Sequence, residues 1–191
     1  MPKASSYKLR DLDRCHQGDI LKDVEYKITK QEGDTFSETT ITFPYVVILT
    51  QDCDLEQDFL NRNNSSSVNE DKYLQSILVC PIFLAEKFKE GTHLELFNLR
   101  RESWDTNRWE CIKRNDNKRV HYLHEDIGFK MVPLVIDFKL YYTVRADEIA
   151  GFHKTNYAIS INDFYREELS LRFSQYLTRI AIPNPGIIDF K

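Results

Sequence analysis

The stretch YVVILT, residues 45–50, decides the fold of this chain. It is continuously apolar and rich in β-branched residues, which is typical of a strand covered on both faces. A second run of this kind, ILVCPI, lies at residues 77–82. Upstream, the alternating VEYKI at 24–28 and the β-branched TTITF at 39–43 predict two strands joined by a hairpin turn at residues 33–34. We therefore predict a mainly β structure.

A C-terminal helix is predicted over residues 162–181. Its first turns are acidic, which favours the helix dipole, and its apolar residues repeat at helical spacing. The expected apolar stripe consists of Tyr165, Leu169, Phe173, Tyr176 or Leu177, and Ile180. A shorter helix is predicted over residues 83–90, and strands over 119–123 and 134–144. Residues 55–72 are rich in Asn, Ser, Asp and Glu, which predicts a mobile polar loop.

Composition excludes several classes of protein. The 191 residues carry 26 basic and 30 acidic side chains, so a uniformly basic nucleic-acid binder is excluded. No apolar run approaches the roughly 18 residues of a membrane helix, and Met1 to Arg14 lacks the apolar stretch of a secretory signal. Four cysteines occur without a CxxC pair. We predict a single domain, residues 1–191, in the cytoplasm and without membrane contact.

The order of motifs resembles that of the PemK/MazF toxin family. Residues 17–20 (QGDI) match the family's GDI turn, and residues 44–50 (PYVVILT) match its RPxVVLS strand. Residues 78–82 (LVCPI) match a VxPI strand, and residues 133–137 (PLVID) match a VxxD strand. An amphipathic helix closes the family's pattern, as it does here over residues 162–181.

This resemblance implies a fold and an activity. The expected fold is a MazF/PemK-like SH3-type β-barrel with helical or irregular inserts at residues 55–72 and 86–118, and a C-terminal helix packed on it. Family members are typically metal-independent endoribonucleases, so neither a metal nor another cofactor is expected. A basic residue stabilises the charge on the phosphate, and an acid or Thr helps proton transfer.

The matching positions predict a degenerate ribonuclease site. Where the family has Arg before Pro, this chain has Phe43, and a second position that is basic in some members is Val135. The proton-transfer positions remain, as Asp137 and Thr50. A replacement cation is sought at Arg145, at Lys139 or in the second insert.

Residues Gln51 to Asp54 follow the first buried strand and form a second candidate site. Cys53 would be a nucleophile or ligand, with Asp52 or Asp54 as its base. Adjacent carboxylates raise the pKa of a thiol, so a polar turn that caps the strand is the favoured interpretation. No metal site is predicted, because His121 and His124 would fall on opposite faces of a strand.

A basic, tryptophan-containing segment lies in the second insert. Residues 98–119 carry a net charge of +3, and both tryptophans of the chain lie within them. Cations interleaved with aromatic rings suit RNA, an acidic protein partner, or a solvated insert whose rings pack on the barrel. The candidate binding residues are Arg100, Arg101, Trp104, Arg108, Trp109, Lys113 and Arg114.

Two functions follow from these patterns. The first is a MazF-like module that binds a protein partner, an antitoxin or regulator, in a bacterial toxin–antitoxin, stress-response or phage-defence system. The alternative is an active, metal-independent, sequence-specific endoribonuclease toxin. A third interpretation is an enzyme that depends on Cys53. RNA and a second copy of the chain are further candidate partners.

Overall fold

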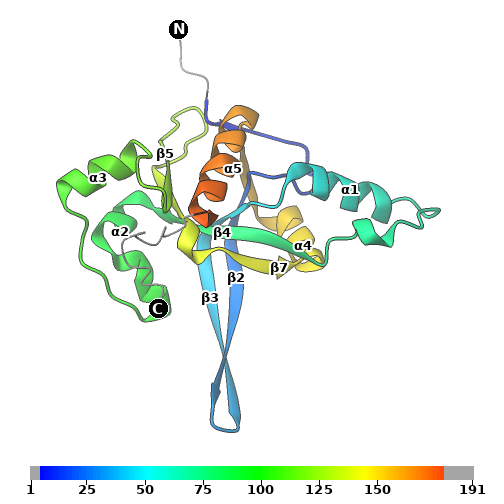
Figure 1. Ribbon diagram of the computed structural model, residues 1–191, viewed down its shortest axis with the longest axis horizontal. Helices are drawn as coiled ribbons and strands as arrows, with labels where there is room; N and C mark the ends of the chain where they lie inside the picture. Colours follow the sequence, from blue (N-terminus) through cyan, green and yellow to red (C-terminus); the bar gives the residue numbers. More distant parts are fainter. Residues whose placement is uncertain (1–4, 179–191) are drawn as a thin grey trace, which may run out of the picture.

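The computed structural model describes residues 5–178 and contains one eight-stranded antiparallel sheet with helices on both sides (Figure 1). The strands are β1 (Tyr7–Lys8), β2 (Asp19–Glu32), β3 (Thr35–Ile48), β4 (Ser76–Leu84), β5 (Val120–Leu123), β6 (Leu134–Asp137), β7 (Tyr142–Arg145) and β8 (Tyr157–Ile161). The helices are α1 (Asp52–Arg62), α2 (Ala85–Glu90), α3 (Thr106–Lys113), α4 (Ala146–Asn156) and α5 (Asp163–Leu177), with 3-10 helices η1 (Glu70–Lys72), η2 (Thr92–Phe97) and η3 (Phe138–Leu140).

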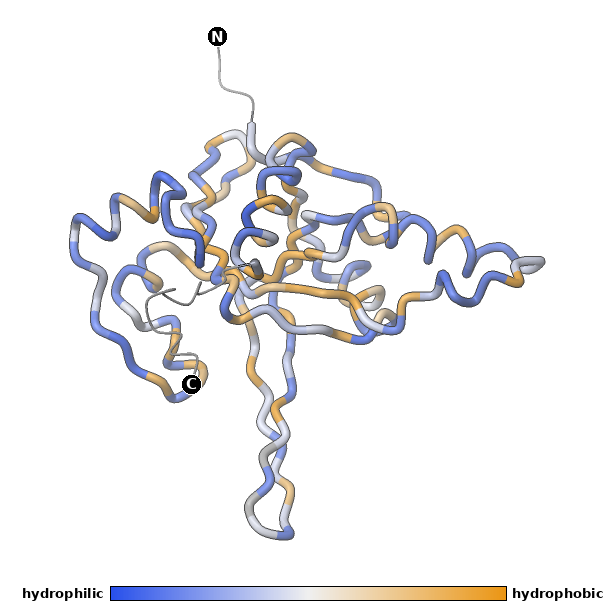
Figure 2. The backbone as a smooth tube through the Cα atoms, in the orientation of Figure 1, coloured by the Kyte–Doolittle hydropathy of each residue, from blue (hydrophilic) through white to orange (hydrophobic). Residues whose placement is uncertain are grey.

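The central strands are buried on both faces, as the continuous apolar run predicts. Val46 and Ile48 belong to one hydrophobic core, and the alternate residues Val47 and Leu49 belong to the other. Because successive side chains of a strand point to opposite faces, two cores require an unbroken apolar run. Figure 2 shows this apolar band along β4, with mostly hydrophilic helices outside it.

Different helices cover the two cores. α5 covers one with Leu169 and Phe173, which confirms that part of the predicted stripe. Leu177 is 51% exposed, and Ile180 lies outside the described residues. The other core receives apolar side chains from four helices, namely Leu55 of α1, Phe88 of α2, Ile112 of α3 and Ile149 of α4.

The sheet is curled but its two end strands are not paired with each other. The strand order is β1-β8-β2-β3-β4-β6-β5, with β7 also paired to β4. The two ends approach where Ser5 Oγ donates to Asp126 Oδ2 at 2.5 Å, close to β1 and to the loop after β5. The structure is thus mainly β, with a half-barrel sheet and a C-terminal helix.

Two segments differ from the sequence prediction. Residues 52–62, expected as a turn and the start of a polar loop, form α1. Asp52 and Asp54 in its first turn and Arg62 in its last turn suit the helix dipole, and Leu55 alone is buried. The expected strand at 134–144 is divided by η3 into β6 and β7, because β4 pairs with β7 along one half and with β6 along the other.

A buried acid fixes the start of β2. Asp19 is fully buried and accepts hydrogen bonds from His16 N at 2.7 Å and Ser160 Oγ at 2.5 Å, and His153 Nε2 lies 2.9 Å from its Oδ2. The turn before it needs Gly18, whose φ is +85°. This network joins β2, β8 and α4, so it sets the position of α4 beside the sheet.

Beyond the body of the protein, β2 and β3 continue as a two-stranded arm (Figure 1). The pairing runs from Ile20↔Val47 to Glu32↔Thr35, and Gly33 takes the positive φ of the tight turn, which confirms the predicted hairpin. At the base of the arm, Tyr26 packs on Phe43 and Tyr142. We use "the arm" below for residues 25–42.

Candidate functional site

The acid of the predicted catalytic pair is buried and held by an arginine. Asp137, at the end of β6, has no exposed surface. Arg119 donates from Nε to Oδ1 at 2.8 Å and from Nη2 to Oδ2 at 2.5 Å, and Lys139 N donates to Oδ1 at 3.1 Å. The hydrogen bond to Asp137 raises the pKa of Arg119. Both carboxylate oxygens are therefore used inside the fold.

Arg119 is a functional candidate that the sequence analysis did not single out. Val120 pairs with Asp137 between β5 and β6, which brings the preceding arginine against the carboxylate. The sequence analysis sought the cation at Arg145, at Lys139 or in the second insert, residues 86–118. Arg145 instead pairs with Asp147 through bonds of 3.0 and 2.7 Å and is exposed. The two positions that are basic in the family, Phe43 and Val135, supply no cation, and Arg119 supplies one beside Asp137.

Phe43 and Val135 are core residues. Phe43 is 1% exposed and Val135 is fully buried, and both belong to the core that α1 to α4 cover. Thr50 lies on the opposite side of β4 from Asp137, and its Oγ1 accepts a hydrogen bond from Leu78 N at 2.7 Å. Two strand spacings separate the flanks of β4 by about 10 Å, so Thr50 and Asp137 do not converge on one reacting atom.

The second candidate site forms the N-terminal turn of α1. Arg14 donates to both oxygens of Asp52 at 3.2 and 3.1 Å, and Gln17 N donates at 3.1 Å. Burial acts to raise the pKa of Asp52, but these hydrogen bonds prevail and lower it to about 2. Cys53 is exposed, and its thiol lies 3.7 Å from Asp54 Oδ1. Asp52 therefore anchors α1, and the groups in contact with Cys53 do not activate its thiol.

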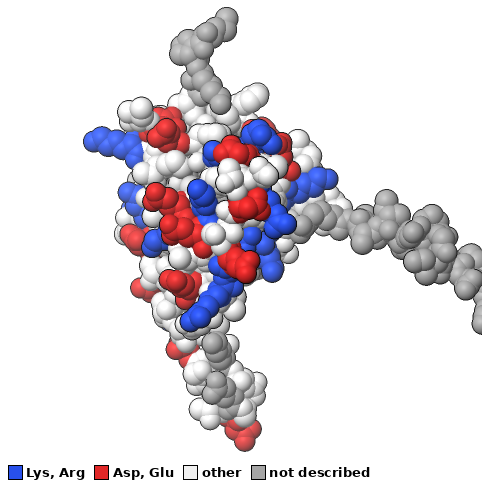
Figure 3. Space-filling model, turned by 90° about the vertical axis from the view of Figure 1, so that its left-hand side faces the viewer, with Lys and Arg blue, Asp and Glu red and all other residues white. Residues whose placement is uncertain are grey.

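Three cations of the second insert pair with acids of the same insert. Arg108 pairs with Asp105, Lys113 with Glu110, and Arg114 with Asp116. Figure 3 shows basic and acidic side chains mixed over this side of the molecule, without a continuous basic face.

The aromatic rings of the insert pack inward. Trp109 is 8% exposed and contacts Tyr122 edge to face, at 5.9 Å between ring centroids. The Arg101 guanidinium lies 3.3 Å above the Trp104 ring, and Arg100 is exposed. Neither ring is free for stacking on a base, so the geometry favours an insert whose tryptophans pack on the sheet.

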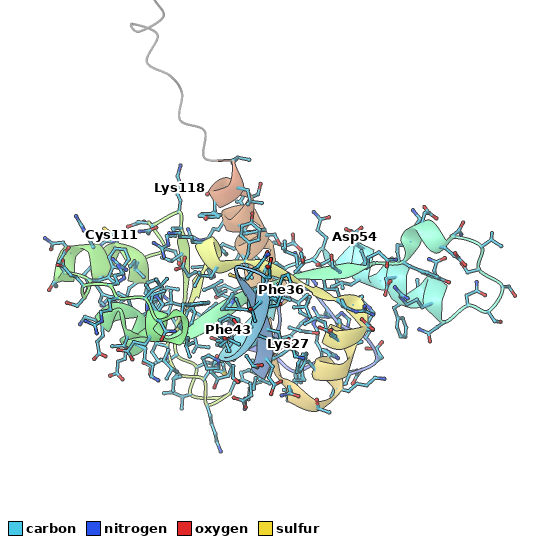
Figure 4. All side chains as sticks on the ribbon, turned by 90° about the horizontal axis from the view of Figure 1, so that it is seen from below. Lys27, Phe36, Phe43, Asp54, Cys111 and Lys118 are labelled. Atoms are coloured by element: carbon cyan, nitrogen blue, oxygen red, sulfur yellow. The ribbon has the colours of Figure 1, made fainter. Side chains whose placement is uncertain are left out.

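The candidate residues are distributed over opposite sides of the protein. Figure 4 shows Asp54 on α1 at one side, and Cys111 of α3 with Lys118 at the other. Among residues 5–178, no group of three or more His, Cys, Asp or Glu side chains is arranged to hold a metal ion. No helix within that range is long and apolar enough to cross a membrane.

A groove lies beside the base of the arm. This groove of about 610 Å³ is bounded by the arm, β7 and α4. Tyr26, Val144 and Phe152 supply apolar surface, and Arg145, which pairs with Asp147, supplies a charged group. Gly151, in the middle of α4, also lines it, and a Cβ at this position would meet no atom within 4 Å. The sequence analysis did not predict α4, so it did not find the groove.

No family model, curated protein or solved structure matches this chain. The candidate sites are therefore judged on their geometry.

Proposed function

We propose that this chain is a PemK/MazF-like module with a degenerate ribonuclease site, which acts by binding a protein partner. The order of motifs supports the family, and a toxin–antitoxin, stress-response or phage-defence system is the setting that this resemblance implies. An antitoxin or regulator is the expected partner.

The groove beside the arm carries the proposal. Its apolar surface suits one or more apolar side chains of a partner segment, and the charged lining residue Arg145 suits polar contacts. Gly151 leaves the helix backbone open to close approach. In contrast, the side-chain oxygens of Asp137 and Thr50 accept hydrogen bonds from other groups of the protein.

A capture experiment tests this function. The full chain is immobilised beside the variants Gly151→Phe, which fills the groove, and Ala150→Phe, whose side chain faces the cavity between α1 and α4. The proposal predicts that wild type and Ala150→Phe retain the same host protein and that Gly151→Phe loses it. Loss in Ala150→Phe with retention in Gly151→Phe contradicts the proposed surface.

One observation favours the alternative, an active endoribonuclease. Arg119 supplies a cation beside Asp137, and burial and then the charge of Arg119 lower the pKa of Arg101. Guanidinium groups are the side chains that bind phosphate best.

A cleavage assay tests the alternative: long single-stranded RNA is incubated in EDTA with wild type, Asp137→Ala or Arg101→Ala. The ribonuclease predicts cleavage by wild type and its loss in both variants, each shown to be folded by circular dichroism. Intact RNA with the wild-type chain, or undiminished cleavage by folded variants, rejects this site as the nuclease centre.

A further inference from the structure

The arm has two free edges. β2 pairs with β8 only as far as Leu21, and β3 pairs with β4 only from Tyr45 onward. Over the arm itself, each strand is therefore hydrogen-bonded to the other alone. A strand edge with unpaired N–H and C=O groups is a template for a further strand.

The two edges differ in charge. On β2, the sequence places Glu25, Lys27, Lys30 and Glu32 along the arm, whereas β3 between residues 35 and 43 carries Glu38 as its one charge. Charged residues, Lys above all, protect edge strands from pairing. The β3 edge, TFSETTITF, has high β-propensity, carries no Lys, and has only Glu38 as a protecting charge, which pairs with Lys27 of β2. It is the edge open to another strand.

The register shows which β3 amides face outward. A two-residue turn closes with the hydrogen-bonded pair Glu32↔Thr35, and bonded and non-bonded pairs alternate along an antiparallel ladder. Phe36, Glu38, Thr40 and Thr42 therefore direct their N–H and C=O groups away from β2. They form one row of unused donors and acceptors.

We propose that the β3 edge of the arm pairs antiparallel with the same edge of a second copy, about a two-fold axis at Thr39. In this register Phe36 meets Thr42 of the second copy, and Glu38 meets Thr40. Like charges are not opposed, and aromatic and β-branched residues face each other, as favourable cross-strand pairs do. This self-complementarity selects a second copy as the occupant.

The length of the arm leaves room for both bodies. Thr35, at the tip, meets Phe43 at the foot of the second copy's arm, where a hollow of about 310 Å³ lies beside Thr42, next to α2 and η2. The arm projects clear of the helices (Figure 1). The two arms would form a four-stranded ribbon, and the groove beside each arm is not used by this contact.

Sedimentation equilibrium of the full chain tests the interface with two matched proline variants. Thr40→Pro removes an outward N–H from the β3 edge, and Thr29→Pro removes one from the β2 edge. Proline is tolerated at edge positions of this kind, and both threonines are exposed. We expect twice the 22.7 kDa chain mass for wild type and Thr29→Pro, and a dimer at least ~10-fold weaker for Thr40→Pro.

A cysteine cross-link tests the register independently of any proline strain. In a Cys53→Ser background, the cysteine introduced by Thr39→Cys lies opposite the same cysteine of the second copy at the two-fold axis. The Cα separation of such a pair suits a disulfide. The cysteine introduced by Ser37→Cys lies opposite Ile41 of the second copy, roughly 13 Å from the same cysteine of that copy. Cross-linking of Thr39→Cys alone supports the proposal. A monomeric wild type, equal cross-linking at both positions, or a dimer that only Thr29→Pro weakens overturns it.

Discussion

Replacement of Gly151 by alanine tests whether the groove is retained at a cost in stability. A glycine in the middle of a helix destabilises it by about 0.5–1 kcal/mol relative to alanine. Gly151 lies within α4, and an added Cβ would meet open space. Gly151→Ala should therefore raise the free energy of unfolding by about 0.5–1 kcal/mol, since no packing opposes the gain.

Urea denaturation followed by circular dichroism measures this change. For a chain of this size the gain corresponds to roughly 1–4 °C in Tm. Ala150→Ser, on the same helix, is the control and should lower stability by a few tenths of a kcal/mol. If Gly151→Ala destabilises the protein, the space beside α4 is not open and the reasoning about the groove fails.

Three further predictions follow from the buried and charged groups. Arg119→Ala leaves the buried Asp137 carboxylate without its partner and should cost about 3–5 kcal/mol in thermal or urea unfolding, whereas a loss below 1 kcal/mol contradicts the pairing. Because the pKa of Asp52 falls from 3.8 to about 2 on folding, its stabilising contribution is complete above pH 3.8 and is lost as pH falls toward 2. Asp52→Asn should therefore flatten the dependence of the urea midpoint on pH in this acidic range, and an unchanged profile counts against the Arg14 contact. Cys53→Ser should leave both Tm and partner capture unchanged, because the side chain is exposed. A loss of activity in this variant would instead support an enzyme that depends on Cys53.

The sequence predicts the strands well because their periodicity is local. The run at residues 45–50 is apolar at every position up to Leu49, and each alternate residue reaches a different core. α1 was not predicted because its sequence is polar and Leu55 is its one buried residue, so it shows no apolar helical pattern. A helix with so few apolar contacts is specified by its charged residues, and a polar, charged sequence is equally typical of a loop.

The site is harder to predict because it depends on long-range pairing. Nothing local in the sequence couples Arg119 to Asp137, and the contact exists because β5 pairs with β6. The groove likewise requires α4 to lie beside the arm, and Gly151 weakens the helical pattern from which α4 could be predicted. The residue types at the positions that the family resemblance singles out are readable from the sequence, but the partners of these residues are not.

Amide hydrogen exchange of the full chain, alone and with its captured partner, tests the central claim most directly. Binding at the groove predicts slower exchange in peptides that cover residues 25–27 and 143–156. Residues 100–114 should exchange at the same rate in both states. Protection confined to residues 100–114 would place the partner on the insert and contradict the account.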